Sequence, residues 1–278
     1  MKLGISIEIY RMDEVEEKVR AAAESGFKYC QMFLREVEAT EATASKVAEV
    51  CRKFGLKIGP VGAYANPLRP DESPMGTDMK KVKEIICLLP ILGSSEIAIW
   101  SGSYSQNLLE YSEGNYGTGA LKELASVTDE ILGLMESING KLIFEPYYTH
   151  VLHDEDSIVS FINLVQSDRV KVVMDPPNFI SPEDYERRDE KMVHLIDSLH
   201  KYIGAAHFKD FRLAPDGSWD YPGPGGGEMN YPLFFRAMAK YEYDSWGIIE
   251  HVKPQEYASA ETFIESQVKK SDLDLQWF

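Results

Sequence analysis

The sequence lacks the features that would assign it to a membrane or a secreted class. It has no run of about 18 apolar residues, so it predicts no membrane-spanning helix. The first residues, MKLGISIEIY, carry neither a basic flank nor a small-residue cleavage motif, and therefore predict no secretory signal. Cysteine is scarce, and an odd count of three favours reduced thiols and a cytoplasmic location over a disulfide framework.

The chain has few basic residues relative to acidic ones. Lysine and arginine number 29 against 45 aspartates and glutamates, which gives a formal net charge of −16. Because an acidic protein repels a phosphate backbone, the composition disfavours a nucleic-acid partner. The chain has no interior linker or low-complexity segment, and its 44% hydrophobic content is ordinary for a globular protein. We therefore expect a single domain over residues 1–278.

Strand-like and helical patterns alternate along the whole chain. Several helical patterns end on a glycine just before a strand, as at Gly55 and Gly93, because a left-handed residue stops a helix at low cost. In the segment before Gly55, Val47, Val50 and Phe54 fall on one helical face. The segments that read as strands are 2–9, 29–34, 56–64, 96–102, 141–145, 169–175, 204–210 and 247–252.

Strands rich in valine and isoleucine, each followed by an amphipathic helix, predict a parallel sheet covered by helices. Eight such units in a chain of 278 residues predict the α/β class and a closed (β/α)8 TIM barrel. An open doubly wound sheet is the alternative. Such a sheet usually has a glycine-rich turn after its first strand, and SIEIYRMDE contains no glycine.

Polar side chains end four consecutive predicted strands, the fifth to the eighth. They are Glu145, Asp175, His207 and Glu250. In a barrel of this kind, the active site lies at the C-terminal ends of the strands. Because side chains alternate along a strand, Ile143 and Glu145 share one face. If that face is the lumen, two glutamates, an aspartate and a histidine converge on a small space.

Three carboxylates cannot crowd together without compensation, because desolvation and mutual repulsion would force protons onto them. A divalent cation is the simplest compensation. Three oxygen ligands with one imidazole suit Mn²⁺, Mg²⁺ or Co²⁺, and we expect Mn²⁺ first, with Mg²⁺ or Co²⁺ as alternatives. Each of the four residues taken singly could instead be a solvated group at the barrel rim.

The chain resembles a known family over essentially its whole length: the xylose isomerase-like barrels, which include ketose 3-epimerases, hydroxypyruvate isomerases and related sugar isomerases. The specific motifs lie in the second half. The motifs that carry the resemblance are FEP, MDPPN, HFKDFR, PGPGGGEMNYPLFFRAM and IIEH, with YANPLRPDESP after the third strand. The resemblance implies that Glu145, Asp175, His207 and Glu250 hold the metal, and that Glu145 and Glu250 also form the catalytic acid/base pair. It further implies a small carbohydrate substrate, and a homo-oligomer or association with a partner subunit.

The chemistry explains this double use. Moving a proton next to a carbonyl passes through an enediolate, which a metal ion stabilises as a Lewis acid. Epimerisation needs a base on each face of the carbon, and aldose–ketose isomerisation needs one base. We therefore expect a metal-dependent isomerase or epimerase of a sugar, sugar phosphate or keto-sugar. A lyase is the alternative because its first step is the same proton abstraction; examples are a dehydratase or β-elimination from a 3-keto-glycoside, as in C-glycoside deglycosylation.

An apurinic endonuclease-like hydrolase is a remote alternative on the same barrel. Apurinic endonucleases share the barrel fold of this family, but they bind a three-metal cluster through several histidines from the early strands. This chain has no histidine before His150. His150, His153 and His251 lie near strand ends without ligand spacing, so we expect them to serve in loops.

Several residues are candidates for substrate binding. Lys209 shares a face with His207 and could hold a substrate oxygen or an enediolate charge, or could be a solvated lysine. Arg212 resembles a family arginine that contacts substrate, or could be an arginine of a surface loop. Asn178 stands where several ketose epimerases carry histidine, and this departure weakens the transfer of their substrate pattern.

Aromatic residues and glycines supply the remaining candidates. Trp100 is a candidate for an apolar wall under a sugar. Further substrate candidates are Tyr64, Asn66 and Tyr147. The run GPGGGE could admit a phosphate close to the backbone, or could be a flexible loop before the next helix.

Overall fold

The eight predicted strands close into a parallel barrel in the computed structural model, which describes residues 1–214 and 216–274. The barrel strands are β1 (Lys2–Ile9), β2 (Tyr29–Leu34), β3 (Lys57–Gly62), β4 (Glu96–Trp100), β5 (Lys141–Glu145), β6 (Val170–Met174), β7 (Ile203–Phe208) and β10 (Trp246–Ile249). Around the barrel the order is β1-β10-β7-β6-β5-β4-β3-β2. The predicted (β/α)8 barrel is thus confirmed, and the open sheet is excluded.

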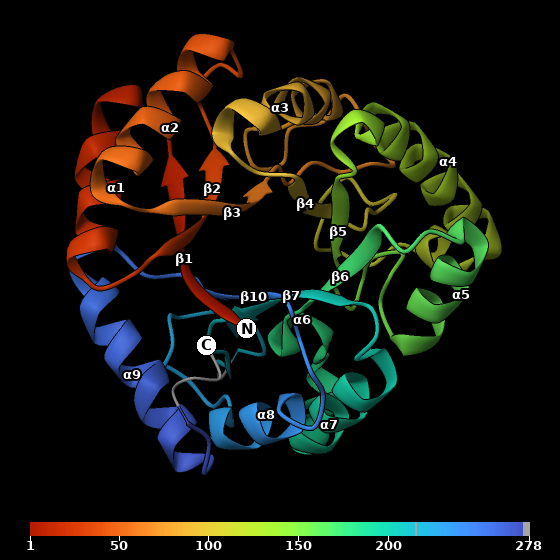
Figure 1. The fold of residues 1–278 in the computed structure, drawn as a ribbon. Helices are drawn as coiled ribbons and strands as arrows, with labels where there is room; N and C mark the ends of the chain where they lie inside the picture. The colour runs from red at the N-terminus through yellow and green to blue at the C-terminus, as the bar shows by residue number, and fades with distance from the viewer. Residues whose placement is uncertain (215, 275–278) are drawn as a thin grey trace.

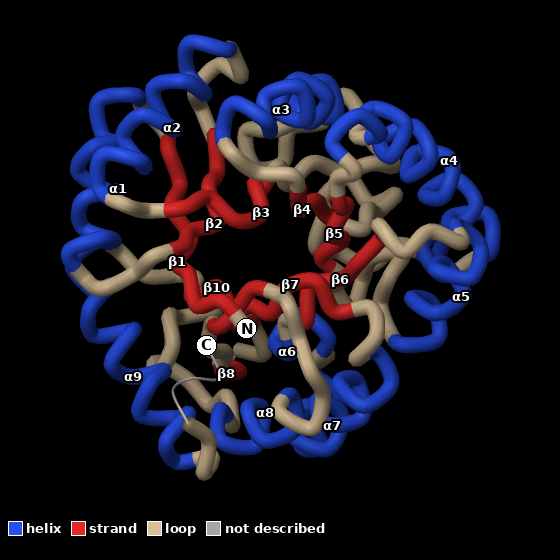
Figure 2. The backbone as a smooth tube through the Cα atoms, viewed as in Figure 1, coloured by secondary structure: helices blue, strands red, loops and turns tan. Residues whose placement is uncertain are grey.

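Helices form a ring outside the strands (Figures 1 and 2). They are α1 (Val15–Glu24), α2 (Glu41–Phe54), α3 (Met79–Leu92), α4 (Thr118–Leu134), α5 (Glu155–Val165), α7 (Arg188–Leu199), α8 (Tyr231–Met238) and α9 (Tyr257–Lys270). The four-residue helix α6 (Pro176–Phe179) directly follows β6 and lies inside this ring in both views. Short 3-10 turns lie at Met12–Glu14, Glu113–Tyr116, Glu136–Ile138, Pro182–Arg187 and Pro254–Glu256. Gly55 and Gly93 end α2 and α3 in the left-handed conformation, with φ of 73° and 75°, as the sequence predicted.

A small hairpin between β7 and α8 was not predicted. It pairs β8 (Arg212–Leu213) with β9 (Trp219–Asp220) in antiparallel fashion, outside the barrel. Two-residue strands are too short to produce a periodic pattern in the sequence. Because the hairpin strands take the labels β8 and β9, the eighth strand of the barrel is labelled β10.

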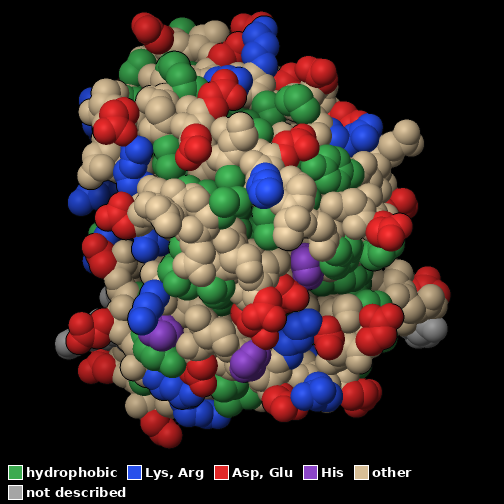
Figure 3. Space-filling model, turned by 90° about the vertical axis from the view of Figure 1, so that its right-hand side faces the viewer, with side chains coloured by type: hydrophobic (Ala, Val, Ile, Leu, Met, Phe, Trp, Pro, Cys, Tyr) green, Lys and Arg blue, Asp and Glu red, His purple; other side chains and the backbone are tan. Residues whose placement is uncertain are grey.

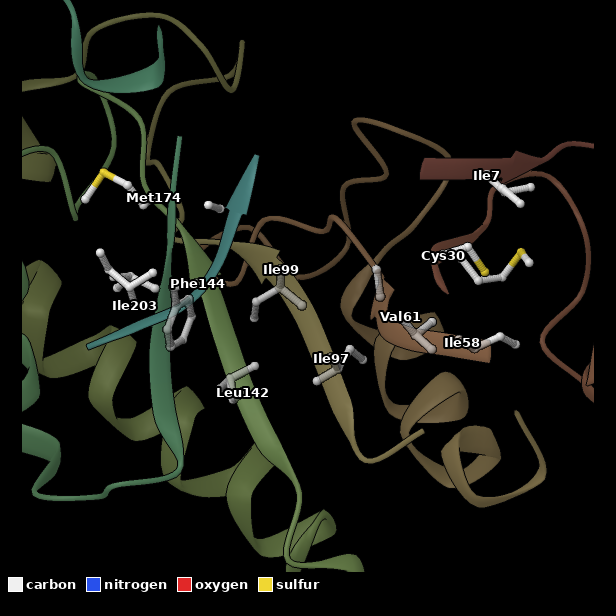
Figure 4. Close-up of a cluster of buried hydrophobic side chains, with 14 of the residues drawn as sticks. Ile7, Cys30, Ile58, Val61, Ile97, Ile99, Leu142, Phe144, Met174 and Ile203 are labelled. Carbon is white, nitrogen blue, oxygen red and sulfur yellow. The ribbon is translucent and has the colours of Figure 1, made fainter. Parts of the chain in front are cut away.

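Two apolar layers lie on opposite faces of the strands. The outer layer lies between strands and helices and contains the side chains that point away from the lumen, such as Leu142 and Phe144 of β5 (Figure 4). The inner layer contains Ile143 of β5, with Val173 of β6 and Ala98 of β4. Since Ile143 faces the lumen, the side chain two residues later, Glu145, faces it as well. The predicted alternation is confirmed.

The outer surface carries both signs of charge. Acidic side chains are interspersed with basic ones over the face shown in Figure 3. Among the described residues, no helix combines the length and the apolar character needed to cross a bilayer.

We expect Gly62→Ala to destabilise the barrel. An added Cβ at Gly62 would lie 2.3 Å from Cε1 of Phe33 and 2.5 Å from its Cδ1, so the ring must move. Overpacking of this kind costs about 1–3 kcal/mol of unfolding free energy, which denaturant titration would measure. Gly133→Ala in α4 is the matched control, because no atom lies within 4 Å of the added Cβ. The control should gain about 0.5–1 kcal/mol, and equal changes in both variants would contradict the argument.

Candidate active site

Four adjacent strands of the barrel carry the four predicted metal ligands. Glu145 is the last residue of β5, and His207 lies inside β7. Asp175 follows β6 at the position before the short helix α6, and its side chain makes no capping hydrogen bond there, while Glu250 directly follows β10. The barrel order β5-β6-β7-β10 makes these strands neighbours. Asp175 and Glu250 therefore lie one residue beyond the strands that the sequence predicted to include them.

The four side chains converge on one ring nitrogen. Nδ1 of His207 lies 3.2 Å from Oε2 of Glu145, 3.6 Å from Oδ2 of Asp175 and 3.2 Å from Oε2 of Glu250. All four residues are buried. Ligand atoms of Glu145, Asp175 and His207 lie within 4.8 Å of one another, close enough for one ion to contact all three. We call these four residues the carboxylate–histidine cluster.

The cluster contains polar atoms whose bonding the protein leaves incomplete. Both ring nitrogens of His207 and Oδ1 of Asp175 are buried without a hydrogen-bond partner. Buried polar atoms nearly always have a partner in a folded protein. A divalent cation would satisfy such atoms, and a set of carboxylates with one imidazole matches the ligands that Mn²⁺, Mg²⁺ or Zn²⁺ accept. The residues therefore fit a divalent metal ion.

A buried lysine lies against the same carboxylates. Nζ of Lys209 contacts Oδ2 of Asp175, and lies 4.0 Å from Oε1 of Glu145 and 3.8 Å from Oε2 of Glu250. Its residue exposure is only 4%, which excludes the alternative of a solvated lysine. The lysine places a fixed positive charge where the carboxylates would otherwise repel one another.

Burial and the charges of neighbouring groups shift the pKa values in the cluster in opposite directions. Burial would raise the pKa of Glu250, but His207 and Lys209 lower it to about 2. Burial acts in the same direction on Glu145, and the same two cations hold its pKa below the usual value. Burial would lower the pKa of Lys209, yet the surrounding carboxylates raise it. Both glutamates are therefore ionised near neutral pH.

A cavity of about 1150 Å³ opens above the cluster and is lined by Glu145, Glu250 and Lys209. Asn178 also lines it and donates from Nδ2 to Oε1 of Glu145 at 2.7 Å. This bond engages one oxygen of Glu145 and leaves Oε2 toward His207. The structure thus places Asn178 on the glutamate itself, where it can orient a base.

A row of aromatic rings borders the same cavity, and we call it the aromatic wall. Ring centroids are 5.5 Å apart for Phe33 and Tyr64, 5.1 Å for Tyr64 and Trp100, and 6.5 Å for Trp100 and Tyr147. The hydroxyls of Tyr147 and Tyr221 lie 3.0 Å apart. All five residues line the cavity. Tyr221 was missed in the sequence because it lies in an irregular segment after the β8–β9 hairpin.

Two predicted substrate residues lie away from the cavity lining. Arg212 is exposed on the β8–β9 hairpin, where its Nε donates to Oδ2 of Asp220 at 2.8 Å. Asn66 is buried, and its amide donates to the Ser103 carbonyl at 2.8 Å while its oxygen accepts from the Leu68 N–H. The contacts of Asn66 hold two loops together.

The glycine run is anchored by an aspartate that sequence reasoning overlooked. Oδ2 of Asp210 accepts from the Gly225 N–H at 2.9 Å, and its Oδ1 accepts from the Met229 N–H at 2.7 Å. A Cβ at Gly227 would lie 2.4 Å from the carbonyl oxygen of Phe211. The glycines therefore allow close backbone packing, and the Gly225 N–H is bonded to protein. Asp210 precedes the first glycine of the run, Gly223, by 13 residues, so no neighbouring residue signalled this contact.

Comparison with protein families gives one match. The model of the family described as xylose isomerase-like TIM barrel matches residues 19–269. A search of curated proteins returned no match.

Solved structures with similar folds include three with informative descriptions. A D-tagatose 3-epimerase-like protein superposes with a TM-score of 0.75 at 15% identity, covering 98% of each chain. The 3-keto-D-glucoside 4-epimerase YcjR of E. coli gives 0.71 at 15% identity, covering 96% of this chain and 99% of that one. The IOLI protein with bound zinc gives 0.68 at 16% identity, covering 100% and 99%. At these identities the likeness shows the fold alone.

The cluster predicts that the protein binds one divalent ion per chain. We expect Asp175→Asn and His207→Ala to weaken Mn²⁺ binding by at least roughly 10–100-fold, the loss seen even when only a supporting residue is removed. Titration calorimetry on chelator-treated protein, with metal content by mass spectrometry, would measure this. Asp197→Asn is the control, because the Asp197 carboxylate lies on α7 and pairs with Lys240 outside the cluster; this variant should bind Mn²⁺ normally. Unchanged binding in both cluster variants would contradict the assignment.

A buried histidine behind the aromatic wall predicts a pH dependence of stability. His150 lies 5.3 Å from Trp100, ring centroid to ring centroid, and its Nε2 donates to the Leu108 carbonyl at 3.0 Å. Burial lowers the pKa of His150 to about 3. Between about pH 6.5 and pH 3, His150 is therefore protonated in the unfolded chain and neutral in the folded chain. Stability contributed by this histidine is therefore present above about pH 6.5 and falls by about 1.4 kcal/mol per pH unit as the pH drops toward 3.

Denaturant unfolding of wild type and His150→Gln between pH 7 and 5 would isolate this contribution. The glutamine keeps a donor for the Leu108 carbonyl, so the difference between the two proteins should narrow as the pH falls. Parallel stability curves over this range would show that His150 does not cause the loss.

Proposed function

Because this chain belongs to the xylose isomerase-like TIM barrel family, we propose that it is a divalent-metal-dependent sugar isomerase or epimerase. The observation that carries the proposal is the pair of buried glutamates, Glu145 and Glu250, each 3.2 Å from Nδ1 of His207 in one cavity. The structural likeness to a D-tagatose 3-epimerase-like protein and to a 3-keto-D-glucoside epimerase supports a carbohydrate substrate. Proton transfer next to a carbonyl is the reaction that we assign.

The metal would be held by Glu145, Asp175, His207 and Glu250. When bound, it would supply Lewis-acid stabilisation of negative charge on substrate oxygens. The zinc bound by the IOLI protein supports a divalent ion in this fold, and Mn²⁺ is our proposal for this chain.

The two glutamates can serve as base and acid. They come from the first and the last of four neighbouring strands, so they reach a bound substrate from different sides. One ionised carboxylate removes the proton at the carbon next to the carbonyl and becomes a carboxylic acid, which can return that proton to the substrate. For epimerisation, the other glutamate takes a proton from solvent and delivers it to the opposite face of the carbon. Asn178 restrains Glu145 through its 2.7 Å hydrogen bond. Lys209 offers a buried positive charge beside the developing enediolate.

The aromatic wall completes the site. Trp100 and Tyr64 present ring surface to the cavity, which suits the apolar face of a sugar and excludes water from the reacting carbon. Nε1 of Trp100 is buried without a partner and can donate to a substrate hydroxyl.

A lyase is the second candidate, and one observation favours it. Tyr147 and Tyr221 form a hydroxyl pair in the cavity, and burial raises the pKa of both, so both stay protonated. A protonated phenol can donate to a departing group after the same proton abstraction. An endonuclease is disfavoured, since the described residues contain one convergent group of potential ligands, and a three-metal cluster needs several.

The proton transfer can be tested directly in D₂O. The Mn²⁺-loaded enzyme should exchange a carbon-bound proton of a ketose or keto-glycoside, detected by NMR across a substrate panel. Glu145→Gln and Glu250→Gln should lower the rate by roughly 10²–10⁴, the range for lost acid/base catalysis. Glu242→Gln, an exposed residue outside the cavity, should keep the wild-type rate. Metal content must be matched in every sample, because both glutamates are proposed ligands.

The products separate the candidates. Deuterium in a sugar that keeps all its substituents supports the isomerase or epimerase, and loss of a substituent supports the lyase. Wild-type turnover by metal-replete Glu145→Gln would remove Glu145 from the mechanism. Metal-dependent nicking of abasic DNA would overturn the proposal.

A further inference from the structure

The cavity is much larger than a sugar requires. Its volume of about 1150 Å³ exceeds the upper end of the range of roughly 300–1,000 Å³ that holds drug-sized molecules. One end is lined by Glu145 and Glu250 of the carboxylate–histidine cluster and by the aromatic wall. The cavity also takes in side chains of β1 and β2 and of the loops at 74–75 and 106–109. A single hexose at the cluster would leave this second region unfilled.

Apolar side chains lie at the open end. Met75 and Leu109 line the cavity although they are 41% and 43% exposed, and Leu108 beside them is buried. Leu108 packs in the same inner layer as Phe33 and Trp100. Exposed apolar side chains that gather at the edge of a pocket are typical of a surface that a ligand covers.

A buried arginine at this end lacks a partner for one of its donors. Arg35 follows β2, is only 5% exposed and lines the cavity, with its guanidinium 4.5 Å from the ring centroid of Phe33. Nε of Arg35 donates to Oε1 of Glu8 at 2.8 Å, but its Nη1 is buried without a hydrogen-bond partner. A buried donor left without an acceptor is costly, so Nη1 fits a site for a ligand oxygen.

The charges nearby favour a neutral ligand. Glu8 already balances the charge of Arg35, and Lys18, half-buried on the same side, lies 3.0 Å from Oε1 of Glu14. A phosphate would meet cations that are already paired. A phenol or carbonyl oxygen needs only the donor that Arg35 has free.

We propose that this outer compartment, formed by Phe33, Arg35, Met75, Leu108 and Leu109, binds the aromatic aglycone of a glycoside. The sugar ring lies at the carboxylate–histidine cluster, and the aglycone stacks on the Phe33 end of the aromatic wall with an oxygen near Nη1 of Arg35. The substrate is then a keto-glycoside with an uncharged aromatic group, and not a free monosaccharide or a sugar phosphate. This inference rests on the proposed function for the position of the sugar.

Binding of two probes tests the compartment without turnover. Phenyl β-D-glucopyranoside should bind the Mn²⁺-loaded enzyme at least about tenfold more tightly than methyl β-D-glucopyranoside, because the ring buries apolar surface. The double variant Met75→Ser/Leu109→Ser should reduce this ratio several-fold and leave the methyl glucoside unchanged. Both positions are exposed, so the fold should tolerate the change. Leu164→Ser on α5, 46% exposed and outside the cavity, is the matched control and should keep the full ratio.

Proton exchange on the corresponding methyl and phenyl 3-keto-glucosides, measured in D₂O, distinguishes failure of the aglycone compartment from failure of the proposed function. Equal affinities for the two probes with exchange intact would overturn the aglycone compartment and leave the proposed function standing. A phenyl preference without exchange on any keto-sugar would overturn the proposed function and leave the compartment standing. Glucose 6-phosphate could instead bind more tightly than the phenyl glucoside and lose this advantage in Arg35→Met. That result would assign the compartment to a phosphate group and overturn this inference.

Discussion

The burial of three carboxylates around one imidazole is the constraint on which the rest of the site depends. Ionised groups removed from water must be compensated, and the barrel brings Glu145, Asp175 and Glu250 together only because His207 and Lys209 lie among them. Asn178 adds a hydrogen bond to the most enclosed glutamate. The buried atoms of the cluster that lack a hydrogen-bond partner are Oδ1 of Asp175 and the two ring nitrogens of His207, so the arrangement leaves a place suited to a cation.

The positions of the main site residues could be predicted because they follow from local rules. Alternation along a strand and the common end of a parallel barrel suffice to bring Glu145, Asp175, His207 and Glu250 together. Properties that depend on tertiary contacts were not predictable. The sequence left Lys209 open between a buried and a solvated position, and it gave no sign that a two-residue hairpin carries Arg212 away from the cavity.

The aromatic wall has two roles that share the same atoms. Trp100 and Tyr64 belong to the apolar layer inside the barrel, together with Ile143 and Val173, and they also border the cavity. Substitutions that reshape the binding surface therefore also alter the packing that holds the strands. This coupling explains why Gly62, which no ligand needs to touch, matters to the site: it makes room for the Phe33 ring.

The division of the cavity between the two halves of the chain has a consequence for divergence. Glu145 and Glu250, to which we assign proton transfer, lie at the ends of β5 and β10, whereas the proposed aglycone compartment takes its residues from β2 and from the loops that follow β2, β3 and β4. Mutations in these loops can change the compartment without replacing a group to which we assign proton transfer. A gene encoding such a barrel can thus acquire new specificity by drift in its 5′ half, and chimaeras joined between β4 and β5 offer a route to recombine recognition with chemistry.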